Sequence, residues 1–376
     1  MKPDLQNPSE TGVRTDPRFE PALQVLQKAI AERAFPGCAY GVLAGDTVVL
    51  IGALGRFTYD DGAQEMTPAT VFDLASVSKV VATTAMAMLL SQRGRLDLDT
   101  PLGDILPGFV IGRPAGDMAR HVKLRHLLAH SSGLPGYAAL FKTEHTPARL
   151  YQACLALPLE AEPGTRAEYS DPGFMLLGKA LEVIAASPLS AWTHREIFEP
   201  LGMRSTRYCP APHARHSIPP TEEDTTWRKR VIQGEVQDEN ASVLKGVAGH
   251  AGVFSNVPDL LRFAAEILVA RPGAEAAAKT SCLFFPDTLE AFAERQPPAG
   301  SSRALGWDTP SENSTSGKHF SAHTIGHLGF SGCSMWIDLA DRIAVVLLTN
   351  RTWPDRSSRL IRQVWPAFHD AIREAL

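Results

Sequence analysis

Ser76 and Lys79 are the two residues of this sequence whose types and spacing first point to chemistry. Residues three apart lie on the same face of a helix, so the serine hydroxyl and the lysine amine can meet within one turn. Lys79 is the only charged residue from Ser76 to Gln92, and most of its neighbours are apolar. Burial in such a helix disfavours the ammonium form and lowers the lysine pKa, which would let Lys79 accept a proton from Ser76.

The same pair also has a purely structural interpretation. Ser76 would then cap the helix, and Lys79 would extend its stem to bring the amine to solvent. The chemical interpretation adds that a helix start presents free backbone N–H groups, where a developing oxyanion could be bound. The pair alone does not decide between the two, so the rest of the chain must.

The elements that would position this pair follow from hydrophobic periodicity and turn residues. Strand patterns occur near both ends of the chain, and helical patterns broken by Pro and Gly fill the middle. This order predicts an α+β fold, in which an antiparallel sheet is flanked by helices and carries an inserted all-helical subdomain. We expect strands at Cys38–Leu43, Thr47–Gly52, Cys333–Asp338 and Arg342–Thr349, and helices at Pro21–Ala34, Ser76–Gly94, Val122–His130, Pro147–Ala156, Gly173–Ala186, Leu189–Phe198, Asp259–Ala270 and Asp355–Ala375.

Two subdomains are predicted from the same pattern. Residues 15–95 and 255–376 would form the sheet subdomain, and residues 96–254 the mainly helical one. Within the second, residues 210–240 are polar and rich in proline and charge, so we expect a long surface loop there. A chain of 376 residues is long enough to bury a large core.

Composition excludes several function classes. Hydrophobic residues make up 44% of the chain and charged residues 21%, with a formal net charge of −4. A weakly acidic protein of this kind has no broad attraction to nucleic acid or to an anionic membrane, so we expect neither as a partner. The start, Met1 to Pro21, is polar and has no apolar region of a signal peptide. The chain as it stands is expected in the cytoplasm, or in the periplasm if a leader was removed.

Neither cysteines nor histidines indicate a metal or cofactor. The five cysteines are scattered without C-x-x-C spacing, which favours reduced thiols over a disulfide framework. The histidines lack an H-E-x-x-H signature, and His213 and His216 lie in a proline-rich loop. We therefore predict no metal site and no cofactor.

Two further motifs support the chemical interpretation of the serine and lysine. Tyr-Ser-Asp at 169–171 follows Pro-Gly and precedes Pro172, as in a tight loop between helices. His-Leu-Gly at 327–329 comes directly before the predicted strand at Cys333–Asp338. With Ser76 and Lys79, the chain shows the order S-x-x-K, Y-x-(N), (K/H)-x-G.

In this order of motifs the chain resembles the serine β-lactamase and penicillin-binding-protein superfamily, on its class C side. The resemblance covers roughly residues 20–370, and three motifs in order are much more specific than any one. The stretches that support it are VKLRHLLAHSSGLPGY (122–137), YSDPGFMLLGKALE (169–182), IFEPLGMRST (197–206) and GVAGHAGVFSNVPDLLRF (246–263).

The resemblance implies a role for each matching residue. Ser76 would be the acylating nucleophile and Lys79 its activator. Tyr169 would exchange the proton between Ser76, Lys79 and the leaving group. The backbone N–H groups of Ser76 and Phe330 would form the oxyanion hole, and Gly329 would leave room for a substrate against an edge strand. Alternatively, Tyr169 packs on the core and His327 is a solvated loop residue.

Two departures from the family pattern bear on the substrate. His327 stands where many relatives carry lysine, and a neutral imidazole offers a hydrogen-bond donor but little charge. Asp171 stands where many carry asparagine, and its charge would repel substrate carboxylates and hold Lys79 more cationic. Both argue against an efficient β-lactamase and suit neutral esters or amides, or a substrate with a free amine. Both residues are expected to contact substrate.

Other residues could shape the cleft. His250, in the segment Gly-His-Ala-Gly before a helix capped near Asn256, could border the substrate or be a solvated turn residue. We favour structural roles for His126 and His130, because no chemistry requires them. Trp307 could line the mouth of the cleft or pack against the sheet.

Three functions remain open from the sequence. The first is a serine hydrolase that acts through an acyl-enzyme on small, carboxylesterase-type esters, with weak β-lactamase activity at most. The second is a D-amino-acid peptidase similar to D-Ala-D-Ala carboxypeptidases, acting on amides or short D-peptides. The third is a penicillin-binding-protein homologue that binds a ligand without catalysis. All three would have a small molecule as their partner.

Overall fold

Five antiparallel strands form the central sheet, in the order β2-β1-β10-β9-β8. The computed structural model describes residues 16–271, 282–312 and 314–376, and residues 1–15, where the sequence predicts no leader, lie outside them. The strands are β1 (Gly37–Ala44), β2 (Thr47–Gly55), β8 (Thr324–Leu328), β9 (Ser334–Asp338) and β10 (Ile343–Thr349). Both ends of the chain therefore contribute to one sheet, as the sequence predicted.

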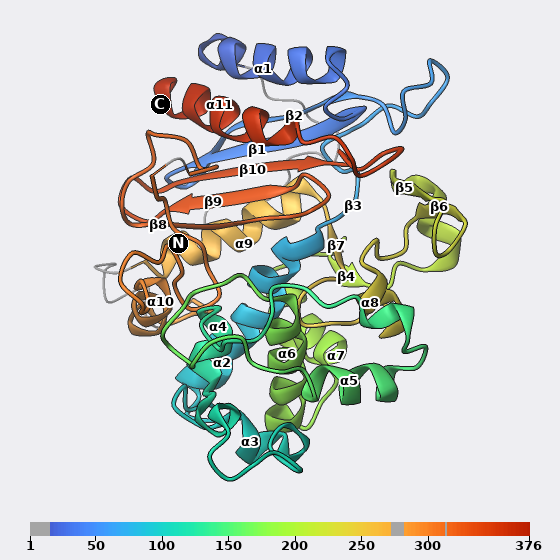
Figure 1. The fold of residues 1–376 in the computed structure, drawn as a ribbon. Coiled ribbons are helices and arrows are strands. Elements are labelled where there is room, and N and C mark those ends of the chain that lie inside the picture. Colours follow the sequence, from blue (N-terminus) through green and yellow to red (C-terminus); the bar gives the residue numbers. More distant parts are fainter. Residues whose placement is uncertain (1–15, 272–281, 313) are drawn as a thin grey trace.

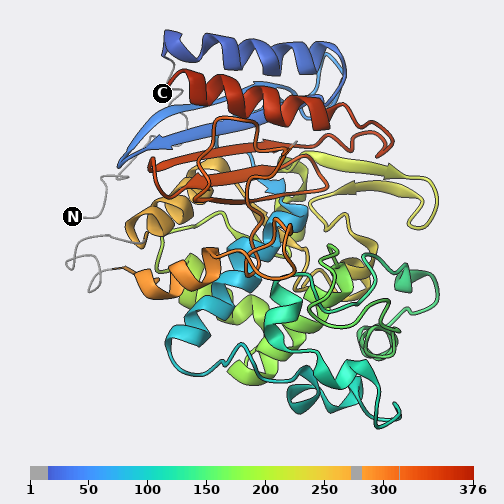
Figure 2. The same cartoon turned by 60° about the vertical axis from the view of Figure 1, so that its left-hand side comes forward.

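Helices cover both faces of this sheet (Figures 1 and 2). On one face, α1 (Glu20–Ala31) and α11 (Ile361–Glu374) lie side by side and enclose a small core with the sheet. On the other face, α9 (Val257–Val269) packs against β1 and β10 and belongs to the main core. The buried residues of α1 recur every three or four positions, which is why this segment forms an amphipathic helix.

The helical part lies below the α9 face of the sheet in Figure 1. Its longest helix, α6, begins at a Ser170 cap whose Oγ accepts a hydrogen bond from the Gly173 N–H (3.0 Å). The helices besides α1, α9 and α11 are α2 (Ala85–Gln92), α3 (Leu102–Ile105), α4 (Leu124–Leu128), α5 (Pro147–Leu155), α6 (Asp171–Ala185), α7 (Leu189–Thr193), α8 (Glu239–Val243) and α10 (Pro286–Ala293). A small second sheet joins β3 (Phe72–Asp73), β7 (Val253–Ser255) and β4 (Arg207–Tyr208).

The α+β architecture agrees with the prediction, whereas several boundaries differ. Strand β8 was not predicted, because its glycine and histidine residues do not form a strand pattern. The last helix begins at Ile361 rather than Asp355, and the helix expected over 122–130 is limited to α4. The proposed subdomain boundaries stay a prediction. Helix α2 lies within residues 15–95, assigned to the sheet subdomain, but packs against α6 of the helical part and against α10.

The segment that starts at Ser76 is not one regular α-helix. Ala75–Val77 forms a 3₁₀ turn, Lys79–Thr84 a π-helical turn, and only Ala85–Gln92 the α-helix α2. The turn begins at Ala75, whose φ of 46° lies in the left-handed region, and the Asp73 carboxylate accepts a hydrogen bond from the Ala75 N–H (2.9 Å). Tight and wide turns of this kind often occur at functional sites.

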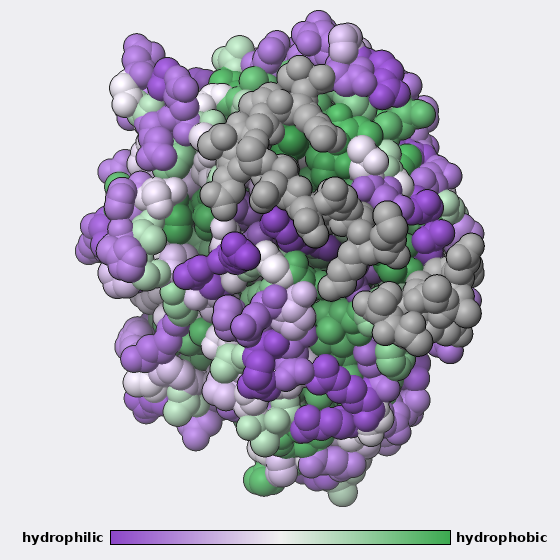
Figure 3. Space-filling model, turned by 180° about the vertical axis from the view of Figure 1, so that it is seen from behind, coloured by the Kyte–Doolittle hydropathy of each residue, from purple (hydrophilic) through white to green (hydrophobic). Residues whose placement is uncertain are grey.

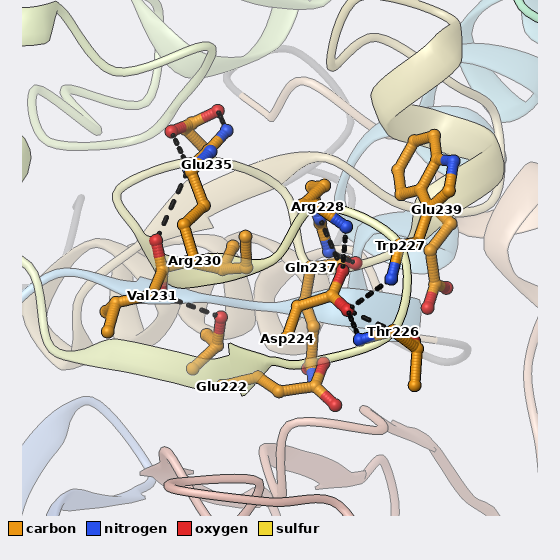
Figure 4. Close-up of polar contacts among 12 residues, drawn as sticks. Glu222, Asp224, Thr226, Trp227, Arg228, Arg230, Val231, Glu235, Gln237 and Glu239 are labelled. Atoms are coloured by element: carbon orange, nitrogen blue, oxygen red, sulfur yellow. Dashed lines mark hydrogen bonds and ion pairs between the residues drawn. The ribbon is translucent and has the colours of Figure 1, made fainter.

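The prediction of a long surface loop at 210–240 is wrong. This segment contains a 3₁₀ helix (Pro212–Ser217), a hairpin of β5 (Pro220–Asp224) and β6 (Arg230–Gln233), and the start of α8. The turn of the hairpin is organised around the buried Asp224 carboxylate, which accepts hydrogen bonds from the N–H groups of Thr226, Trp227 and Arg228 (Figure 4). Charged residues point inward here and find partners, which a search for apolar periodicity cannot detect.

Among the described residues, no single helix is long and apolar enough to cross a membrane, although the bent pair Asp171–Ala185 and Leu189–Phe198 passes by length and composition alone. On the face opposite to that of Figure 1, hydrophilic and apolar residues are intermixed over the visible surface (Figure 3). All five cysteines are free thiols, three of them buried.

Candidate active site

Ser76, Lys79 and Tyr169 meet in a closed triangle of hydrogen bonds. The Tyr169 hydroxyl lies 2.6 Å from Ser76 Oγ and 2.6 Å from Lys79 Nζ, and Lys79 Nζ lies 3.0 Å from Ser76 Oγ. Ser76 and Lys79 come from the turns that precede α2. Tyr169 comes from the loop before α6, directly before the Ser170 cap. The structure thus brings together the three residues that the motifs selected, in a geometry that permits proton exchange among them.

Lys79 is fully buried and faces more acceptors than it has protons. Its Nζ also lies 2.7 Å from Asp171 Oδ1 and 3.1 Å from the His250 carbonyl oxygen. An ammonium group has three N–H bonds, whereas four oxygen atoms surround this nitrogen. The amine is therefore held in one place by contacts from three separate parts of the chain.

The charge of Asp171 decides the protonation of this cluster. Burial acts to lower the pKa of Lys79, but the Asp171 carboxylate and the Tyr169 hydroxyl outweigh it, so the pKa of Lys79 is raised. Burial, together with Asp171, also raises the pKa of Tyr169, against the opposing effect of Lys79. At neutral pH the resting site therefore holds an ammonium and a neutral phenol. Of the two effects expected from the sequence, the lowering of the Lys79 pKa by burial and its raising by Asp171, the second prevails.

His327 lies in β8, buried next to Tyr169 with its ring centroid 5.9 Å from that of the tyrosine. Burial, followed by the nearby Lys79 and Arg303 cations, holds the pKa of His327 well below its ordinary value. The neutral ring donates its Nδ1–H to the Leu328 carbonyl (2.7 Å). The remaining nitrogen, Nε2, is then an acceptor without a partner among the described residues. Two expectations are corrected: His327 is not solvated, and its ring N–H is not available to a substrate.

The turn after β8 is in close backbone contact with the segment that precedes Ser76. A Cβ on Gly329 would lie only 2.4 Å from the Leu74 carbonyl oxygen, so a close backbone approach requires glycine here. This differs from the predicted reason, which was room for a substrate. The Ser331 hydroxyl donates to the Asp73 carbonyl (2.7 Å) and fixes the same turn from its other side.

Phe330, whose N–H is the second expected oxyanion donor, lies at the tip of this turn. Its carbonyl accepts a hydrogen bond from Arg351 Nε (2.7 Å). The residue is 49% exposed, and the Arg351 guanidinium lies over its ring. The contact between Gly329 and Leu74 keeps the Phe330 peptide next to the segment that carries Ser76. The roles of both N–H groups stay a prediction.

His250 reaches the cluster through its backbone rather than its ring. Its carbonyl accepts from Lys79, whereas Nε2 of its buried ring lies 2.9 Å from Asp238 Oδ1. The alternative of a solvated histidine is therefore wrong. The His250 side chain opposes the effect of burial on Asp238 and lowers the pKa of that carboxyl to about 2.

Two functional candidates were missed in the sequence. Asp73, three residues before Ser76, is buried and accepts hydrogen bonds from the Ala75 and Gln237 N–H groups, and burial raises its pKa to about 6. Arg303 places its guanidinium carbon 5.4 Å from the centroid of the Tyr169 ring. Neither belongs to a motif, and only the folded chain brings them to the site. Trp307, by contrast, is buried and packs in the main core.

No group of three metal-ligating side chains occurs within the described ranges, and His213 and His216 lie in the short 3₁₀ helix Pro212–Ser217. The cluster around Ser76 consists of hydroxyl, amine and carboxylate groups, which can transfer an acyl group without a bound cofactor. The absence of cofactor and metal nevertheless stays a prediction.

Comparison with known proteins shows the family of this chain. Residues 22–365 match the family described as Beta-lactamase. The chain belongs to the β-lactamase family. It is 30% identical to an N-acetylmuramyl-L-alanine amidase of Bacillus subtilis, over 93% of this chain and 85% of the relative. It is 29% identical to a putative D-alanyl-D-alanine carboxypeptidase of Salmonella paratyphi B, over 85% and 80% of the two chains.

Solved structures show the same fold. EstCE1, a hydrolase with promiscuous acyltransferase activity, superposes with a TM-score of 0.75 at 22% identity, over 95% of this chain and 98% of that one. The relatives similar to this chain in sequence are thus named an amidase and a putative carboxypeptidase, and a hydrolase with acyltransferase activity shares its fold.

Proposed function

We propose that this protein is a serine hydrolase that acts through an acyl-enzyme on small ester substrates. The observation that carries the proposal is the contact of Ser76 Oγ with both the Tyr169 hydroxyl and Lys79 Nζ. A hydroxyl held between two groups that can exchange protons is the arrangement expected of an activated nucleophile.

The reaction would proceed in two half-reactions. Ser76 Oγ attacks the ester carbonyl after the Lys79–Tyr169 pair has lost one proton, and the pair takes up the serine proton. The N–H groups of Ser76 and Phe330 would stabilise the oxyanion. Tyr169 then gives a proton to the departing alcohol, and water hydrolyses the acyl-enzyme through the same groups in reverse order.

The charge around the nucleophile supports a neutral substrate. Asp171 adds a negative charge 2.7 Å from Lys79 Nζ, and the neutral His327 adds no cation. The Lys79–Asp171 pair has no net charge, so this cluster offers no excess cation to a β-lactam or peptide carboxylate, and we expect weak β-lactam hydrolysis at most.

A second candidate, carboxypeptidase-like hydrolysis, is favoured by Arg303. This cation lies over the Tyr169 ring, the residue proposed to protonate the leaving group, and its contact with Asp308 is a single one of 3.4 Å. It could pair with a carboxylate on the leaving group. The name of the Salmonella relative is consistent with such a substrate.

Covalent labelling tests the proposal. The wild-type protein should gain the mass of a fluorophosphonate probe, and Ser76→Ala should not. Ser91→Ala, in the same helical region, is the control and should label like wild type. Labelling of Ser76→Ala would show that another residue is the nucleophile. Esterase activity should fall by several orders of magnitude in Ser76→Ala, because a nucleophile and its activators act as a unit.

A substrate pair separates the candidates. An ester with a neutral leaving group and the same ester with a carboxylate on that group are compared by kcat/KM. Preference for the neutral ester supports the esterase proposal, and preference for the charged one supports the carboxypeptidase-like alternative. A protein that binds without catalysis would show no burst of released alcohol with either.

A further inference from the structure

His130 accepts hydrogen bonds from the two residues on either side of Tyr169. It follows α4 with a φ of 54° and is 2% exposed. Its carbonyl accepts a hydrogen bond from the Glu168 N–H (2.8 Å), and its Nδ1 accepts one from the Ser170 N–H (3.0 Å). Glu168 and Ser170 are the residues on either side of Tyr169, so one histidine accepts hydrogen bonds from the backbone N–H groups of both chain neighbours of the tyrosine.

The imidazole ring adds a third contact. Its centroid lies 4.7 Å from that of the Tyr169 ring, with an interplanar angle of 37°. The imidazole ring also packs against Phe174 of α6, at 4.9 Å between centroids. Movement of the Tyr169 ring toward His130 would therefore displace a ring that itself contacts a buried phenylalanine.

The bond to Ser170 requires one particular state of the ring. Nδ1 can accept an N–H only when it carries no proton, so the neutral imidazole must hold its proton on Nε2. Burial, followed by the Arg303, Lys79 and His327 groups that face it, holds the pKa of His130 well below its ordinary value. The acceptor state is thus the populated one at neutral pH.

We propose that His130 is a positioning residue that sets the place of the Tyr169 hydroxyl between Ser76 and Lys79. This inference rests on the proposed function, because it concerns the same tyrosine. The sequence predicted only a structural role for His130. We infer in addition that it supports proton transfer by Tyr169.

The physical reason lies in the short contacts that the tyrosine makes. Its hydroxyl is 2.6 Å from both partners, and proton transfer loses efficiency steeply when such distances lengthen. Tyr169 would serve the leaving group most when that group is a poor one. A p-nitrophenolate departs without being protonated, whereas an alkoxide needs a proton as the bond to it breaks.

The test compares two esters of one acid, p-nitrophenyl butyrate and ethyl butyrate. We expect His130→Phe, which keeps a ring but loses the acceptor, to lower kcat/KM for the ethyl ester at least about tenfold more than for the p-nitrophenyl ester, equivalent to about 1.4 kcal/mol. His130→Asn, whose amide oxygen can accept from the Ser170 N–H, should recover part of the difference.

His126, in the preceding helix α4, provides a matched control. Its Nδ1 also accepts a backbone N–H, that of Lys123 at 3.2 Å, but no contact joins its ring to Tyr169 among those described. His126→Phe should change both esters equally. Thermal unfolding of each variant gives its folded fraction, to which the rates are normalised.

Non-additivity provides a second readout. With Tyr169→Phe as background, His130→Phe should cause no further selective loss for the ethyl ester, because the group that it positions is gone. Equal losses for both esters in His130→Phe and His130→Asn would overturn the inference and leave a structural role only. If wild type hydrolyses neither ester and does not label, the proposed function fails instead, which is a distinct result.

Discussion

A single carboxylate sets the resting charge of the candidate active site. Burial acts to lower the pKa of Lys79, and Asp171, at 2.7 Å, has the largest effect in the opposite direction. With this carboxylate present the amine is an ammonium and Tyr169 a neutral phenol. Neither group can take the Ser76 proton in that state. The reactive form therefore requires the loss of one proton from the coupled Lys79–Tyr169 pair, whose apparent pKa belongs to the pair.

Asp171→Asn should shift the pH profile to the acid side. The wild-type kcat/KM for a neutral ester should rise with pH as the pair loses its proton. Removal of the carboxylate lowers the pKa values of Lys79 and Tyr169, so the rise should move by about one pH unit or more to lower pH. The exposed Asp104→Asn is the control. Identical profiles for wild type and Asp171→Asn would show that the carboxylate does not govern the pair.

At the scale of residues, sequence motifs select the chemical groups but not their states. The identities of Ser76, Lys79 and Tyr169 as neighbours followed from three motifs in order. The sequence offered both directions for the pKa of Lys79, which burial lowers and Asp171 raises. Which effect prevails depends on a distance that only folding defines. The tautomer of His327 was equally inaccessible, since it is set by the Leu328 carbonyl.

At the scale of elements, the turn after β8 is positioned by a close backbone contact. Gly329 meets the Leu74 carbonyl, two residues before Ser76, where no side chain fits. The contact couples the strand that carries His327 to the turn that carries the nucleophile. The distance between the two expected oxyanion donors thus depends on one glycine.

Gly329→Ala should impair both stability and catalysis. The new Cβ would lie 2.4 Å from a backbone oxygen and 3.3 Å from Cys333 Cβ, so the turn must move away from Ser76. We expect a loss of about 1–3 kcal/mol in the free energy of unfolding, measured in urea, together with a lower kcat/KM. Gly62→Ala is a matched control, because nothing lies within 4 Å of its added Cβ. Unchanged stability and activity in Gly329→Ala would contradict the close approach.

Whether an element could be predicted from the sequence depended on whether its buried residues are apolar or polar. Helices with apolar residues at helical spacing, such as α1, α6 and α9, were found, and so were β1, β2, β9 and β10. The β5–β6 hairpin was missed, because its buried positions include Thr221, Glu222 and Asp224. Their polar groups are paired inside the protein, which replaces the apolar pattern that marks a strand.

At the scale of the whole molecule, an ion-pair cluster joins three distant segments. Arg356, from the segment before α11, contacts Glu222 of β5 and lies 2.9 Å from Glu239 of α8. Each carboxylate side chain is only 10% exposed. The Arg356 guanidinium also lies 5.7 Å from the Phe330 ring, so the cluster borders the turn that carries an expected oxyanion donor.

Arg356→Met should destabilise the protein as a whole. It leaves two nearly buried carboxylates without their cation, and breaking such a pair by removing one partner costs about 3 kcal/mol. The exposed Arg359→Met, a nearby cation on the same segment, should change the free energy of unfolding by less than about 0.5 kcal/mol. Chemical unfolding of the two variants measures the difference. Equal stability of both would show that the cluster contributes nothing net.

The π-helical turn at Lys79–Thr84 has a consequence for how this chain tolerates changes in length. A π turn holds one residue more than an α turn, so it accommodates an extra residue while the segments before and after it keep their mutual orientation. Deletion of one residue from Val80 to Thr84 would therefore allow a regular helix and leave Lys79 near its present orientation relative to α2. A deletion within the regular part, Ala85–Gln92, would instead rotate Lys79 by about 100° relative to the residues beyond the deletion. The chain should thus tolerate the loss of a residue inside the π turn better than the loss of one from α2.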